Sequence, residues 1–183
     1  MTSKATKWVR ERIATGPAIY GLVVFSVLVA SISDEVLESF LEGTDLDELD
    51  AIVPGSERMA TLGVTVATVL SFLIFYVVHV YAETIARHGD QSLKEAVVAA
   101  KRHSAGMLYT ASLPTLVLII WLIGGWSVEN ASIATLGVAM LVLAYVSYEA
   151  AAQRGARVVN RVLTALVSAI VGAVIIILDY LFR

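Results

Sequence analysis

Long apolar runs without a charged residue are the feature that most limits what this chain can fold into. About 20 predominantly apolar residues are needed for a helix to cross ~30 Å of hydrocarbon. Five segments qualify, at residues 17–33, 59–83, 105–126, 131–151 and 158–181. The sequence therefore predicts an all-α, polytopic membrane protein with five transmembrane helices in a bundle.

The composition agrees with this interpretation. Hydrophobic residues make up 58% of the chain and charged residues 16%, whereas soluble domains are about 45–50% apolar and ~25% charged. The apolar runs do not alternate with polar residues as the strands of a membrane barrel would. No inter-span segment is long enough to bury its own core, so we expect residues 1–183 to form one membrane domain without a cleavable signal peptide.

The basic residues fix the predicted orientation, because cytoplasmic segments of membrane proteins are enriched in Lys and Arg. Eleven of the 13 Lys and Arg residues lie in three alternate segments: Lys4, Lys7, Arg10, Arg12; Arg87, Lys94, Lys101, Arg102; Arg154, Arg157 and Arg161. We therefore expect a multi-pass protein of the cell membrane, with its N-terminus in the cytoplasm and its C-terminus outside.

Two segments outside the spans have their own character. The external loop, residues 34–58, is acidic, and we expect two short amphipathic helices in it, broken at Gly43. It is either a cation-collecting vestibule or a solvated lid. Residues 91–104 predict a cytoplasmic interfacial helix that begins with a capping box, Ser92 and Glu95. We expect its basic residues, like those of residues 4–13, to bind anionic lipid headgroups on the cytoplasmic side.

The second span carries a polar stripe. His79, Glu83 and Arg87 are four residues apart and therefore share one helix face, a pattern that suits proton relay or a divalent metal. Glu83 lies ~36 Å from Met59 along the helix, which places it at the headgroups. The alternative is therefore a polar network that anchors the inner end of the helix.

Glu149 is the only acid in the fourth span and lies ~27 Å from Ala131. Ionisable residues inside a membrane usually face the bundle interior or a watery cavity. A salt bridge from Glu149 to Arg154 or Arg161 is an equal alternative. We predict an inner polar cluster of His79, Glu83, Arg87, Tyr109, Tyr148, Glu149, Asn160 and Arg161. His79, Glu83 and Glu149 are also weak candidates for metal ligands.

Two further features concern helix packing. Pro114 interrupts the third span and frees the carbonyl of Thr110, so we expect a kink that is either structural or a hinge. Small residues recur four apart, as at Ser168 and Gly172, and such stripes let helices approach closely. We expect these stripes to serve packing within one bundle, with oligomer contacts as the alternative.

The function predicted from these features is an oligomeric channel or transporter for protons or small cations. The alternative is a non-catalytic scaffold or accessory subunit of a membrane complex, and a second alternative is an intramembrane lipid-modifying enzyme that uses His79 and Glu83. The sequence contains no catalytic motif, no cofactor motif and too few clustered basic residues for nucleic-acid binding. We therefore expect no cofactor, and the bilayer and a homo-oligomer or membrane complex as partners.

Overall fold

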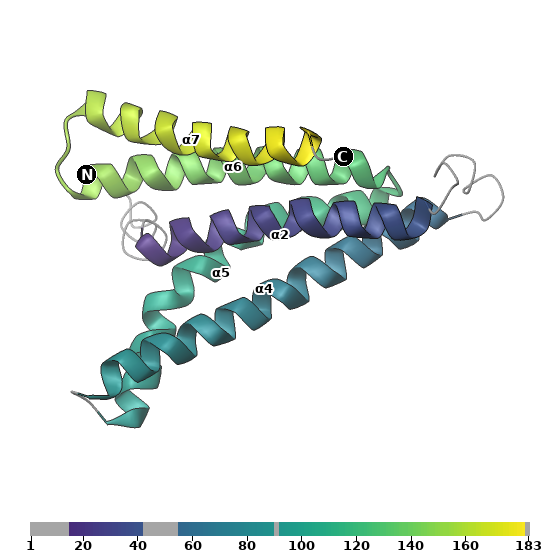
Figure 1. Ribbon diagram of the computed structural model, residues 1–183. Coiled ribbons are helices and arrows are strands. Elements are labelled where there is room, and N and C mark those ends of the chain that lie inside the picture. Colours follow the sequence, from purple (N-terminus) through teal and green to yellow (C-terminus); the bar gives the residue numbers. More distant parts are fainter. Residues whose placement is uncertain (1–14, 42–54, 90–91, 182–183) are drawn as a thin grey trace.

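The computed structural model describes residues 15–41, 55–89 and 92–181, and these residues form five α-helices and no strand (Figure 1). The helices are α2 (Gly16–Leu41), α4 (Ser56–His88), α5 (Leu93–Gly124), α6 (Val128–Gln153) and α7 (Val158–Leu181). Each contains a stretch long and apolar enough to cross a membrane, which confirms a helix of that length at each of the five predicted positions.

Several helices are longer than their predicted spans. The predicted capping box is present: the Ser92 hydroxyl accepts a hydrogen bond from the Glu95 backbone, and the Glu95 carboxylate accepts one from the Ser92 backbone. Residues 93–104 form the first three turns of α5 and run without a break into the third predicted span, because no glycine or proline lies among them. Their position at a membrane interface stays a prediction. α2 likewise continues to Leu41, whereas Gly43 and residues 4–13 lie outside the described residues.

Consecutive helices run antiparallel, so that alternate connections lie at the same end of the molecule (Figure 1). The end that carries Gly16, His88, Leu93, Gln153 and Val158 is called the basic end here. α2 contacts all four other helices. Toward the basic end, the α4–α5 hairpin diverges from α2, α6 and α7 (Figure 1).

The main core lies where α2, α4, α5 and α6 meet, and includes Phe25, Phe72, Met107, Leu118 and Leu136. Phe25 and Phe72 pack edge to face, with ring centroids 5.5 Å apart.

The last helix is peripheral, since only 6% of the α7 span is buried against 44% of the α6 span. α7 packs chiefly on α6, where a Cβ on Gly172 would lie 2.8 Å from Met140 Cγ. The Ser168 hydroxyl donates to the Ser147 hydroxyl over 2.7 Å. The Ser168–Gly172 stripe therefore serves packing within the chain, as the sequence suggested.

α2 and α5 approach each other closely at Gly21. A Cβ built on Gly21 would lie 2.8 Å from the Met107 Cβ and 3.2 Å from the Met107 Cα, so backbone as well as side chain would have to move. Met107 is completely buried. The contact between Gly21 and Met107 therefore sets the spacing between α2 and α5.

We expect Gly21→Ala to lower the free energy of unfolding by about 1–3 kcal/mol, because the added methyl overpacks a contact that cannot relax. Gly137→Ala is the matched control: it lies inside α6 with nothing within 4 Å of its would-be Cβ. That substitution should stabilise by up to ~1 kcal/mol through helix propensity. Unfolding of purified protein in one detergent measures both, and equal shifts for the two variants would contradict the close contact.

Candidate functional site

The bend in α5 is the starting point of the candidate site. Pro114 lies inside the helix, is buried, and has no N–H to donate to the carbonyl of Thr110. Side chains around it bond to neighbouring carbonyls: the Ser112 hydroxyl donates to Tyr109 O over 2.7 Å, and the Thr115 hydroxyl to Ala111 O over 2.7 Å. The α5 ribbon is bent in Figure 1, as expected of a helix that contains a proline.

The bend is tied to the centre of the bundle by Thr110. Its hydroxyl lies 3.0 Å from Gly106 O and 3.1 Å from Met107 O on its own helix. The same hydroxyl is 3.2 Å from the Ala18 carbonyl oxygen in the first turn of α2, and Thr110 is 1% exposed. A buried polar contact thus joins α2 to α5 one turn before the proline.

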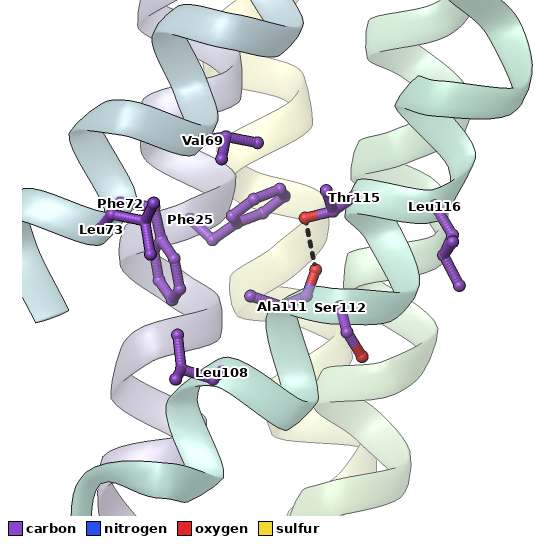
Figure 2. Close-up of a pocket in the computed structure, with 9 residues that line it drawn as sticks. All are labelled: Phe25, Val69, Phe72, Leu73, Leu108, Ala111, Ser112, Thr115 and Leu116. Atoms are coloured by element: carbon purple, nitrogen blue, oxygen red, sulfur yellow. Dashed lines mark hydrogen bonds between the residues drawn. The ribbon is translucent and has the colours of Figure 1, made fainter. Parts of the chain in front are cut away.

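A pocket of about 340 Å³ opens where bent α5 separates from α4, with α2 behind it (Figure 2). Its volume lies within the ~300–1,000 Å³ range of small-molecule sites. Its walls are Phe25 from α2, Val69, Phe72 and Leu73 from α4, and Leu108, Ala111, Ser112, Thr115 and Leu116 from α5.

The pocket is apolar and lies midway along the helices. The two hydroxyls in its wall, Ser112 and Thr115, are the ones that donate to α5 carbonyls, and the Thr115 bond is drawn in Figure 2. They therefore have no donor left for a ligand. Leu73 lies 15 residues before His88, or ~22 Å along the axis. The pocket can accept hydrocarbon but offers little to an ion.

The predicted stripe on α4 divides into an ion pair and an aromatic contact. Arg87 donates to Glu83 Oε1 from Nε over 2.9 Å and from Nη2 over 2.6 Å. His79 instead lies between Phe75 and Tyr20, with ring centroids 6.3 and 6.2 Å away. Its buried Nε2 has no hydrogen-bond partner among the described residues. Of the three residues in the predicted stripe, Glu83 and Arg87 are therefore the two that bind each other.

The other predicted residues lie on α5, α6 and α7. Glu149 is buried at 8% exposure, whereas Tyr148 is half-buried and Asn160 is exposed. Arg161 donates through Nε to the Ala156 carbonyl over 2.7 Å, which fixes the α6–α7 turn. Tyr109 is exposed on α5.

Toward the basic end, α4, which carries the stripe, diverges from α6, which carries Glu149 (Figure 1). The inner polar cluster as a whole stays a prediction. Among the described residues, no group of three or more His, Asp or Glu side chains could hold a metal ion.

The sequence analysis did not predict a group of buried Ser and Thr hydroxyls in the half of the bundle away from the basic end. Ser33 and Ser132, both 0% exposed, join α2 to α6 with their Oγ atoms 2.6 Å apart. Thr65 and Thr135 each donate to the carbonyl four residues earlier, over 2.7 Å. Thr68 Oγ1 is buried without a partner among the described residues. The four-residue spacing of Thr61, Thr65 and nearby Thr68 was the available signal.

Comparison with known proteins gives no relative: no family model, curated protein or solved structure matches the chain. The site therefore has to be interpreted from its own chemistry.

We expect Thr110→Val to lower the free energy of unfolding by about 1 kcal/mol, because a side chain of similar shape loses the hydrogen bond that ties α5 to α2. Thr164→Val is the control, since the exposed Thr164 hydroxyl donates over 2.8 Å only to Asn160 O on its own helix. Its effect should stay within ~0.5 kcal/mol. Unfolding in detergent measures both, and a Thr110→Val protein as stable as wild type would refute this role for the contact.

Proposed function

We propose that this chain is a multi-pass membrane protein that binds the hydrocarbon chain of a lipid in the pocket at the α5 bend. The observation that carries the proposal is the apolar pocket itself, lined by three helices near mid-span. In a membrane, the molecules that surround such an opening are lipid chains.

The favourable free energy of binding a lipid chain would come from packing contacts rather than from the hydrophobic effect. Lipid tails are as apolar as the pocket wall, so transfer between them yields no hydrophobic free energy. An empty pocket, however, forfeits the dispersion contacts of its lining atoms. A chain that fits between the Phe25 and Phe72 rings restores those contacts. We therefore expect binding that selects for chain shape and is modest in affinity.

We further propose that the basic end faces the cytoplasm of a cell and that the opposite end lies outside. The antiparallel order of the helices supports this, since it brings the α4–α5 and α6–α7 turns, with their Arg and Lys residues, to the same end (Figure 1). Positive charge concentrates on the cytoplasmic side of membrane proteins.

Photolabelling tests the pocket. A phospholipid with a photoreactive group near the middle of its acyl chain should label peptides from α4 and α5 in the reconstituted wild type. Ala111→Phe should reduce that labelling several-fold, because Ala111 lines the pocket and a phenyl ring would fill it. Leu113→Phe is the control, since Leu113 is 53% exposed and does not line the pocket.

Thr115→Leu fills the same space from a second position, which guards against one variant failing to fold. Both pocket variants are compared with wild type for thermal stability before labelling. Undiminished labelling in two folded pocket variants would show that the lipid chain does not lie there.

Proton or small-cation transport by an oligomer remains the second candidate. Glu149 favours it, as a carboxylate that is 8% exposed within an apolar helix. Intramembrane carboxylates often belong to ion paths. The path would have to be completed by further copies of the chain, because Glu149 and the α4 stripe lie on diverging helices (Figure 1).

A liposome flux assay tests this candidate. Under it, Glu149→Gln should abolish proton or cation flux, because the amide cannot carry the charge. Glu129→Gln, an exposed acid in the first turn of the same helix, should leave the flux unchanged. Equal flux in wild type and Glu149→Gln, or no flux in either, would rule the candidate out.

The two remaining alternatives have less support. A lipid-modifying enzyme would use Glu83 to orient His79, but Glu83 Oε1 accepts two hydrogen bonds from Arg87. A scaffold that binds a larger membrane complex remains a prediction.

A further inference from the structure

One face of α5 links the bend pocket to the basic end. Leu108, at the edge of the pocket nearest that end, is preceded at seven-residue spacing by Lys101 and Lys94. Residues seven apart lie almost directly above one another on a helix, ~10 Å apart along its axis. Lys101 and Lys94 are both exposed. The side of α5 that opens into the pocket therefore continues as a side that carries ammonium groups.

The described acids of the hairpin do not neutralise these lysines. Glu83 accepts both hydrogen bonds from Arg87, and Glu95 accepts hydrogen bonds from Ser92. Within residues 55–89 and 92–124, no ion pair is found for Lys94, Lys101 or Arg102. The side chain of Lys101 is thus available to an anion that approaches along this face.

We propose that the occupant of the pocket is an anionic phospholipid, whose phosphate is bound by Lys101 while one acyl chain enters between α4 and α5. This inference rests on the proposed function and adds the headgroup class to it. A phosphate at Lys101 lies ~10 Å from the pocket edge at Leu108. That separation is bridged by the glycerol backbone and the first methylenes of a chain, which leaves the rest of the chain for the pocket.

Lys101 fits this role better than its basic neighbours. Arg102 is rotated by ~100° around the helix from Lys101, which turns it away from the pocket side. Lys94 lies a further ~10 Å from the pocket, in the first turn of α5. Zwitterionic lipids offer Lys101 a phosphate whose charge is compensated within the headgroup, so charge complementarity favours a lipid with net negative charge.

The test compares two photoreactive lipids with identical acyl chains, one with a phosphatidylglycerol and one with a phosphatidylcholine headgroup. Each is incorporated in trace amount into phosphatidylcholine nanodiscs that contain the full chain, and labelling of α4 and α5 peptides is quantified. The wild type should be labelled more by the anionic probe, and added salt should reduce the difference because the lysine is exposed.

Lys101→Gln should bring the two probes to parity while labelling by the phosphatidylcholine probe stays unchanged. Lys101→Arg should keep the preference, because the cation is retained. Arg157→Gln is the matched control, since it removes an exposed cation from the α6–α7 turn at the same end, and it should keep the preference too.

The outcomes distinguish the headgroup inference from the acyl-chain proposal. Equal labelling of wild type by both probes, or an unchanged preference in Lys101→Gln, would overturn the headgroup inference while leaving the acyl-chain proposal in place. Labelling by both probes that Ala111→Phe does not reduce would overturn the acyl-chain proposal itself, and the headgroup inference with it.

Discussion

A proline in the middle of a helix of membrane-spanning length removes one backbone hydrogen bond, which no water can replace in a hydrocarbon core, and much of this structure is arranged around that loss. Pro114 lies inside the bent helix α5, and the side chains of Ser112 and Thr115 donate to the carbonyls of Tyr109 and Ala111, the residues on either side of Thr110. Thr110 joins the helix to α2, which comes close enough because residue 21 has no side chain. Tight packing on the α2 side and an open pocket toward α4 are therefore two results of one bend.

The geometry of α5 determines how the pocket is oriented relative to the basic residues at the end of the α4–α5 hairpin. Because α5 is continuous from its cap at Ser92, the rotation that directs Leu108 at the pocket also fixes the direction of Lys101 two turns earlier. A break in α5 between Lys101 and Leu108 would have left that angle unspecified. The apolar pocket and Lys101 lie on one face of α5, in the same order as the acyl chain and the charged headgroup of a phospholipid. The buried hydroxyls of Ser33 and Ser132 instead join α2 to α6.

The sequence predicted what depends on hydropathy and local hydrogen bonding. The five helices, the Ser92–Glu95 cap, the Pro114 kink and the Ser168–Gly172 packing stripe all follow from patterns within a few residues. It did not predict where helices diverge, since that depends on contacts such as Gly21 with Met107, which are distant in sequence. For the same reason, the sequence placed His79 and Glu149 at a similar depth but could not predict that α4 and α6 diverge toward the basic end (Figure 1). The pocket was missed because apolar wall residues look the same in sequence as apolar core residues.

The unequal lengths of the helices have a consequence for the surrounding bilayer. α4 has 33 residues and is therefore ~50 Å long, well beyond the ~30 Å of a hydrocarbon core, whereas α7 has 24 residues and is ~36 Å long. Such hydrophobic mismatch is relieved by tilting, by kinking or by projecting into water. The α4–α5 hairpin already diverges from α2, α6 and α7, and α5 contains Pro114 (Figure 1). A change of bilayer thickness that altered the tilt of this hairpin would therefore also change the shape of the pocket between α4 and α5.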